Sequence, residues 1–173
     1  MPKCDRLVDV GRRQFLRGSA ATAAGAVAVA VAPTAPAKAA GAARVDYPSS
    51  RLANVKDLKT NEPFDILYPD ADAPGVLLKF GARVEGGVGP DADIVGFTII
   101  CPHKGFPLAY STEKRTLNCP GHYSVFDPEK GGQQVWGQAT QNLPQYVLRV
   151  DDKGDIYAEG VDELLYGRLS NVL

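Results

Sequence analysis

The sequence is poor in the side chains that most enzymes use for catalysis. Its 173 residues include two histidines, three cysteines, one methionine and one tryptophan. We find no nucleophile elbow and no phosphate-binding loop, and the glycines at 86, 87 and 89 are followed by Pro90 and indicate a turn. Because both histidines belong to the motif described below, none remains as a general base. The sequence therefore predicts no catalytic residue of its own.

Charge of one sign is also lacking. The formal net charge is -1 and the sequence pI is about 6.1, so nothing indicates binding to nucleic acid. Residues 1–39 hold six Lys or Arg and two acidic residues, and the remainder holds 13 basic and 18 acidic side chains. This mildly acidic balance is typical of an ordinary soluble surface, and the alternative is a surface that steers a basic partner.

Disulfides are not expected. Cys4 lies in the N-terminal segment, which leaves Cys101 and Cys119 for the rest of the chain. An exported protein of this size commonly gains stability from disulfides, whereas this one would have none.

Residues 1–39 have the features of a twin-arginine export signal. Arg12 and Arg13 precede an uncharged stretch from 18 to 37 that is rich in Ala and Val, and Ala37-Lys38-Ala39 resembles a cleavage site. We expect a cleaved signal and a periplasmic protein. A retained anchor on the periplasmic face of the inner membrane and a basic amphipathic helix are the alternatives. Residues 40–50 are expected to be a linker or a docking arm.

The remaining part, residues 51–173, is predicted to be one all-β domain of antiparallel sheet with a small cluster-binding subdomain. Short strand-like runs cover 64–68, 76–80, 94–100, 146–150 and 156–159, and the last two flank a turn at 151–155. Helix is expected only as a turn at 55–58 and a short segment at 161–168.

Two short loops carry the metal-binding side chains. Cys101 and His103 form a C-x-H pair in the loop at 101–106, and Cys119 and His122 form a C-x-x-H pair in the loop at 119–124. A thiolate and an imidazole on each loop match the ligands of a Rieske [2Fe-2S] centre, with the cysteines on one iron and the histidines on the other. A tetrahedral zinc site is the alternative, although zinc motifs usually pair like ligands.

The two loops resemble the cluster-binding loops of Rieske iron-sulfur proteins, which in respiratory members read C-T-H-x-G-C and C-P-C-H-G-S. The resemblance implies one Rieske [2Fe-2S] cluster per chain. Phe106 and Gly121 stand where those members have disulfide-bonded cysteines, so packing by Phe106 and Pro107 would have to hold the loops together. Ser124 stands where high-potential members carry a serine that bonds a bridging sulfide, and Phe126 replaces their tyrosine.

Among Rieske proteins, the amino-acid sequences of the two loops are most similar to those of the small subunit of arsenite oxidase. That resemblance implies a large partner with a molybdopterin cofactor and a [3Fe-4S] cluster, which oxidises arsenite to arsenate. Electrons would pass through this chain to a periplasmic cytochrome c or a small copper protein. The alternatives are a subunit of a quinol-cytochrome c oxidoreductase, a soluble ferredoxin of a dioxygenase and a zinc-binding structural domain.

Overall fold

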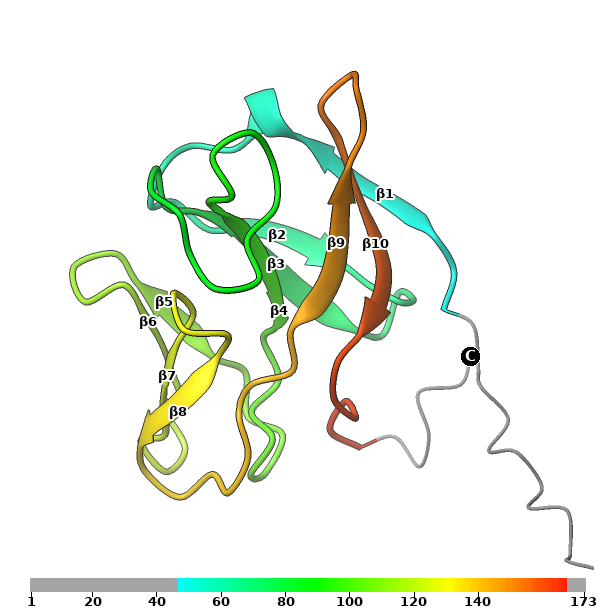
Figure 1. The fold of residues 1–173 in the computed structure, drawn as a ribbon. Coiled ribbons are helices and arrows are strands. Elements are labelled where there is room, and N and C mark those ends of the chain that lie inside the picture. The colour runs from blue at the N-terminus through cyan, green and yellow to red at the C-terminus, as the bar shows by residue number, and fades with distance from the viewer. Residues whose placement is uncertain (1–46, 168–173) are drawn as a thin grey trace, which may run out of the picture. The chain divides into compact units, whose positions relative to one another are not determined.

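The computed structural model describes residues 47–167, and Figure 1 shows them as an assembly of short strands. Every ladder between named strands is antiparallel, and the described residues include no α-helix, only one 3-10 turn, η2 (Val55–Asp57). The strands, in chain order, are β1 (Ser50–Asn54), β2 (Phe64–Leu67), β3 (Pro74–Lys79), β4 (Ile94–Thr98), β5 (Ala109–Ser111), β6 (Thr116–Asn118), β7 (Val125–Asp127), β8 (Gln133–Trp136), β9 (Tyr146–Val150) and β10 (Asp155–Val161). The predicted all-β antiparallel fold is therefore confirmed.

A central sheet of order β2-β3-β4 is buried on both faces at β3 and β4. Alternate residues of a strand point to opposite faces. Leu77 and Ile94 accordingly join one hydrophobic cluster with Tyr146, whereas Leu78 and Phe97 join the other, which also contains the two cysteines. Burial on both faces explains why residues 94–100 form a nearly continuous apolar run in the sequence.

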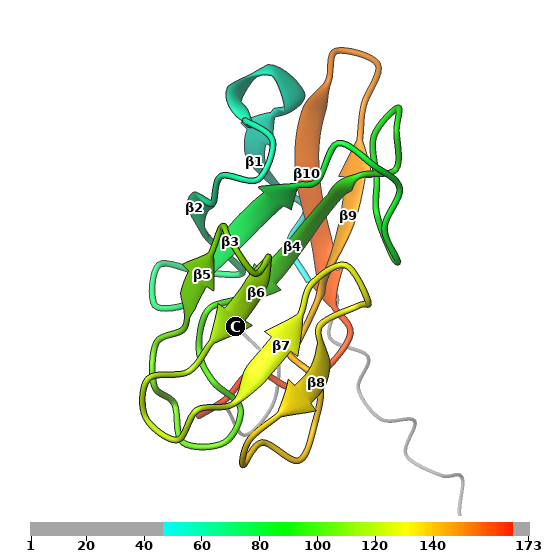
Figure 2. The same ribbon diagram turned by 90° about the vertical axis from the view of Figure 1, so that its left-hand side faces the viewer.

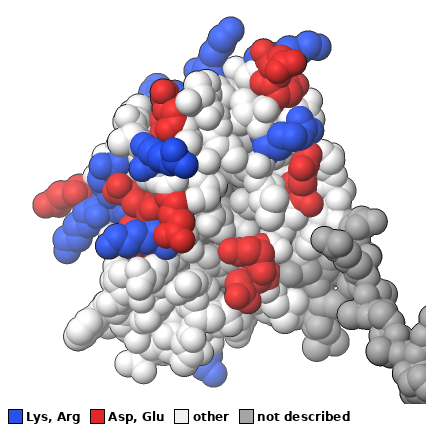
Figure 3. Space-filling view, viewed as in Figure 1, with Lys and Arg blue, Asp and Glu red and all other residues white. Residues whose placement is uncertain are grey.

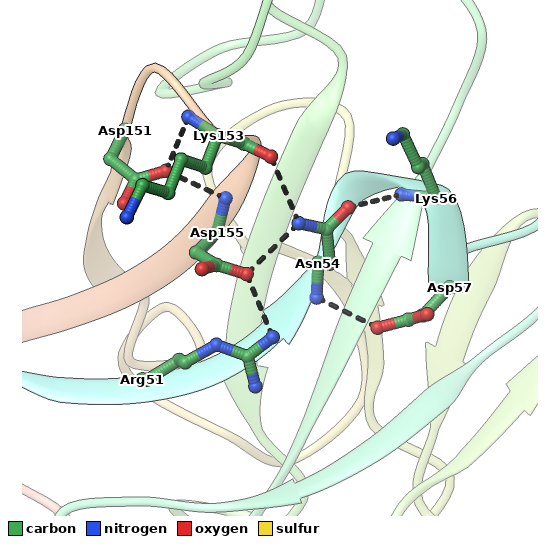
Figure 4. Close-up of polar contacts among 7 residues, drawn as sticks. All are labelled: Arg51, Asn54, Lys56, Asp57, Asp151, Lys153 and Asp155. Atoms are coloured by element: carbon green, nitrogen blue, oxygen red, sulfur yellow. Dashed lines mark hydrogen bonds and ion pairs between the residues drawn. The ribbon is translucent and has the colours of Figure 1, made fainter.

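A second sheet has the order β1-β10-β9 and closes one side of the domain. Figure 4 shows how side chains fasten β1 to the β9–β10 hairpin. Arg51 pairs with Asp155 at 2.7 Å, and the Asn54 amide donates to Asp155 and to the Lys153 carbonyl. Asn54 also caps η2 by accepting the Lys56 N–H. The Arg51 guanidinium, followed by the Asn54 amide, lowers the pKa of the Asp155 carboxyl.

The third sheet, of order β5-β6-β7-β8, carries the second metal-binding loop and lies in the lower part of both ribbon views (Figures 1 and 2). Asn61, which precedes β2, joins this sheet to the rest of the domain: its amide accepts from the Tyr110 hydroxyl at 2.7 Å and donates to the Thr112 carbonyl. An ion pair of Arg115 with Glu129 spans two segments of the same lobe. These contacts orient the lobe that holds the predicted cluster loops.

Several details differ from the sequence predictions. The structure adds β1, which begins at Ser50, the last residue of the predicted linker, and four strands of three or four residues, β5 to β8. The helix predicted at 161–168 is wrong for its described part, because Asp162 instead pairs with Gln145 through its backbone N–H and its carboxylate. The predicted export signal at 1–39 lies outside the described residues. Between residues 47 and 167, no helix has the length and apolar character required to cross a bilayer.

Candidate metal centre

The first loop, residues 101–106, follows β4 and begins at Cys101, which is fully buried in the core. The Cys101 N–H donates to the Phe106 carbonyl at 2.8 Å, and the Gly105 N–H donates back to the Cys101 carbonyl at 2.9 Å. Gly105 has φ of +71°, a left-handed conformation that glycine adopts without steric cost. These bonds close a compact loop around His103.

The second loop, between β6 and β7, repeats the same closure. The Cys119 N–H donates to the Ser124 carbonyl at 2.8 Å, and the Tyr123 N–H donates to the Cys119 carbonyl at 3.1 Å. Tyr123 takes the place of the glycine in the first loop and has φ of +61°. The two loops are thus near copies in backbone geometry, and each presents its cysteine at the same point of the turn.

The two cysteine thiols lie in the same hydrophobic core cluster. Cys101 is fully buried and Cys119 is 2% exposed, and both are free thiols. Burial is the main cause that raises the pKa of the Cys101 thiol, and the neighbouring Cys119 adds to it, whereas the backbone N–H groups of His103 and Lys104 oppose it. Two buried thiols in one core cluster, with the backbone N–H groups of His103 and Lys104 next to the Cys101 sulfur, form a site in which a cation would stabilise the thiolates.

The two imidazoles lie nearer the surface than the thiols. The ring centroids of His103 and His122 are 4.8 Å apart, with the planes 78° to each other. His122 is exposed, whereas the Nδ1 atom of His103 is buried and has no hydrogen-bond partner. A buried ring nitrogen without a partner is costly unless a metal or a donor completes it. The donor set therefore fits a metal group lying between an inner sulfur pair and an outer nitrogen pair.

Phe106 packs between the two loops at the predicted place. Its ring lies 5.7 Å from the His122 ring between centroids, and a Cβ atom added to Gly121 would come within 2.7 Å of it. An aromatic contact thus joins positions 106 and 121, which confirms that packing by Phe106 links the loops. The absence of a side chain at Gly121 is what allows this approach.

Ser124 is fully buried, and its hydroxyl oxygen accepts two backbone N–H groups. Gln138 donates to it at 3.1 Å and Ala139 at 3.0 Å. With those two bonds occupying the oxygen's lone pairs, the hydroxyl proton must point elsewhere. Gly137, with φ of +98°, lets the segment approach, because a Cβ there would lie 2.4 Å from the Ser124 Cα. Sequence reasoning missed this segment, which lies 13 to 15 residues beyond Ser124.

The four predicted donors are therefore brought together as a thiol pair and an imidazole pair, with Ser124 beside them. Residues 50–147 match the family model described as "Rieske [2Fe-2S] domain". The chain belongs to the Rieske [2Fe-2S] family. A Rieske protein carries one [2Fe-2S] cluster per chain and transfers single electrons through it. The predicted cofactor is thus confirmed.

Relatives within the Rieske family include subunits of iodate reductase. The chain is 41% identical over 165 residues to iodate reductase subunit IdrB of Denitromonas iodatirespirans, a match that covers 94% of this chain and 86% of that protein. It is 43% identical over 129 residues to the subunit of the same name from Pseudomonas sp. strain SCT, covering 73% and 67%. The cytochrome bc1 complex Rieske iron-sulfur subunit of Corynebacterium efficiens matches 69 residues at 36% identity, covering 39% of this chain and 17% of that protein.

Solved Rieske structures share the fold. The soluble domain of Rieske protein II (soxF) from Sulfolobus acidocaldarius superposes with a TM-score of 0.59 at 25% identity, covering 66% of this chain and 78% of that one. The plasma membrane Rieske protein PetC3 from Synechocystis PCC 6803 has a TM-score of 0.51 at 20% identity, covering 64% and 99%. Both likenesses support the antiparallel all-β fold.

Proposed function

We propose that this chain is the electron-transfer subunit of a periplasmic molybdenum oxidoreductase that acts on an oxyanion. Cys101 and Cys119 would hold one iron of the cluster, and His103 and His122 the other. The observation that carries the ligand assignment is the division of four donors into a buried thiol pair and an outer imidazole pair. In this role the buried parts of the two loops would exclude water from the cysteine-bound iron. The histidines would form the edge of the cluster at which electrons enter or leave.

Iodate reduction is the reaction that we favour for the catalytic partner. The 41% identity to an iodate reductase subunit extends over 94% of the chain, so it includes far more than the two loops. Reduction of iodate consumes electrons, so this subunit would carry them from a periplasmic cytochrome c or a small copper protein to a large subunit. That large subunit would hold the molybdopterin cofactor and the [3Fe-4S] cluster.

Arsenite oxidation is the second candidate, because the sequences of the two loops resemble those of arsenite oxidase small subunits. The loops read Cys-Pro-His-Lys-Gly-Phe and Cys-Pro-Gly-His-Tyr-Ser. The electrons would then run the opposite way, from the large subunit through this chain to the same class of carrier. Export by the twin-arginine route suits either reaction, since that route carries folded proteins with their cofactors in place.

The direction of electron flow distinguishes the two reactions in one experiment. The tagged chain is isolated with its partner from the periplasm of its own host, and molybdenum and iron are measured. If the complex reduces iodate, adding iodate to the reduced complex should abolish the rhombic EPR signal of the cluster. Adding arsenite to the oxidised complex should then produce no signal, because arsenite would not reduce the cluster. A signal induced by arsenite would favour arsenite oxidation, and a complex free of molybdenum would refute both.

A further inference from the structure

Tyr123 combines an unfavourable backbone conformation with a large exposed ring. Its φ is +61°, and in the twin loop the same position is Gly105. Its side chain is nevertheless 74% exposed. Left-handed backbone disfavours residues that carry a Cβ, and an exposed ring gains little from burial within the chain. The fold itself would be served better by glycine, so the benefit of a tyrosine here must lie outside the isolated chain.

Trp136, at the end of β8, is the second exposed aromatic residue of this surface. It is 70% exposed, and together with Tyr123 and His122 it lines a groove of about 500 Å³. The other lining residues are uncharged: Gln134, Gly137 and Gln138. The groove is therefore lined by the exposed imidazole of the metal centre and by two large aromatic side chains.

The surroundings of this groove are almost free of charge. No Asp, Glu, Lys or Arg occurs at 116–126 or at 131–148, and Lys104 is the one such residue at 99–112. Figure 3 shows the same division in space, with the charged side chains gathered over the upper part and the lower left nearly bare of them. A transient carrier that docks by electrostatic steering needs complementary charge. Interfaces of permanent complexes are instead depleted of charge and enriched in Tyr, Trp and Phe.

We propose that Tyr123 and Trp136 are the anchors by which this chain binds its catalytic subunit, on a surface of that subunit that is itself apolar and uncharged. The proposal rests on the proposed function, since it names the surface through which the partner is held. The groove places the partner against His122, the exposed edge of the centre. The soluble electron carrier, in contrast, would reach the complex elsewhere.

The test uses the complex isolated from the periplasm, with the molybdenum-to-iron ratio after gel filtration and the dissociation constant as readouts. Tyr123→Gly and Trp136→Ser should each raise the dissociation constant about 30-fold, the effect of a strong anchor residue, and lower the molybdenum ratio. Tyr123→Phe, which keeps the ring, should bind as the natural chain does. Leu67→Ser, which removes a 56% exposed apolar side chain from β2, is the matched control and should change neither readout.

Tyr123→Gly also separates a docking role from a structural one. Because glycine suits the left-handed position, the thermal midpoint of the free subunit should stay the same or rise while partner binding weakens, and the reduced EPR spectrum should be unchanged. A lowered midpoint with unaltered binding would overturn the proposal, as would full molybdenum content in both variants. The proposal would also be overturned if the free subunit formed a homodimer that these substitutions dissociate while the molybdenum-to-iron ratio of the complex stays unchanged. If the natural chain itself copurifies without molybdenum, the proposed function fails first.

Discussion

At the scale of single residues, Ser124 shows how a backbone segment distant in sequence prepares a side chain next to the metal centre. Its oxygen is already an acceptor for the Gln138 and Ala139 N–H groups, so its proton remains available as a donor. Hydrogen bonds directed at cluster sulfur raise the reduction potential of a Rieske centre, because the reduced form carries the additional negative charge. Ser124, which the resemblance to high-potential Rieske proteins predicted to be a donor to the cluster, thus has the geometry of a hydrogen-bond donor.

We therefore predict that Ser124→Ala lowers the midpoint potential. A differential hydrogen bond of about 1–2 kcal/mol corresponds to roughly 40–90 mV for a one-electron centre. Gln138→Pro, which removes one of the two N–H donors that orient the hydroxyl, should shift the potential in the same direction by a smaller amount. Ala139→Gly keeps its N–H and serves as the control in the redox titration. A potential that is unchanged in Ser124→Ala would show that the hydroxyl does not act on the cluster.

At the scale of elements, the packing of Phe106 links the two loops, and the two cysteines of the described residues form no disulfide. Phe106 reaches across to Gly121 and His122, although its side chain remains 42% exposed. A half-buried contact of this size contributes about 1–2 kcal/mol, which is less than a typical disulfide. The loops should consequently separate more readily here than in relatives with the covalent link.

Phe106→Ala should therefore accelerate loss of the cluster on heating, because the first loop loses its packing against the second. The measurement is the rate at which the visible absorbance of the centre bleaches at a fixed temperature. Phe106→Leu should lie between the natural chain and the alanine variant. Leu67→Ala, remote from the loops on β2, should bleach at the natural rate, and equal rates for all four proteins would contradict the assigned role of Phe106.

At the scale of the whole molecule, the domain is stabilised by two cores that share the central sheet. Tyr68 is fully buried in the core that lies away from the metal centre, where its ring contacts Tyr47 and Tyr146 and its hydroxyl donates to the Pro48 carbonyl. Burial, followed by the neighbouring Tyr47, raises the pKa of the Tyr68 hydroxyl to about 12. The neutral form is favoured in the folded state, as expected for a buried phenol.

The free energy of unfolding should therefore fall in alkali. The Tyr68 pKa is about 10 in the unfolded chain and about 12 in the fold, so its contribution is fully present below pH 10 and is lost between pH 10 and 12. The loss amounts to about 2 kcal/mol, and burial also raises the pKa of Tyr110, which acts in the same direction. Denaturant unfolding followed by circular dichroism at pH 8 and pH 11.5 measures it. Tyr68→Phe should have a lower free energy of unfolding than the natural chain at pH 8, but this free energy should fall less between pH 8 and pH 11.5. An equal fall in both proteins would exclude Tyr68 as the cause.

Local patterns predicted part of this architecture. The apolar run that contains β4 and the turn-separated pair β9 and β10 follow from side-chain alternation and turn chemistry, which act over a few residues. Strands of three or four residues such as β5 to β8 escaped prediction because so short a segment shows no clear alternation and owes its conformation to pairing. A short helix was predicted at 161–168, whereas Asp162 lies in a bend and is bound by Gln145, 17 residues away.

The sequence by itself determined the chemistry of the metal centre: which four side chains can donate to a metal, and that they occur as two mixed pairs on two short loops. Tertiary structure decided their arrangement, with sulfur inside and nitrogen outside, and the contacts of Ser124 with Gln138 and of Phe106 with Gly121. It also decided that Tyr123 and Trp136 share one exposed groove. The reason is physical: ligand identity and loop spacing are local properties of the chain, whereas burial and side-chain proximity depend on how distant strands pair and pack.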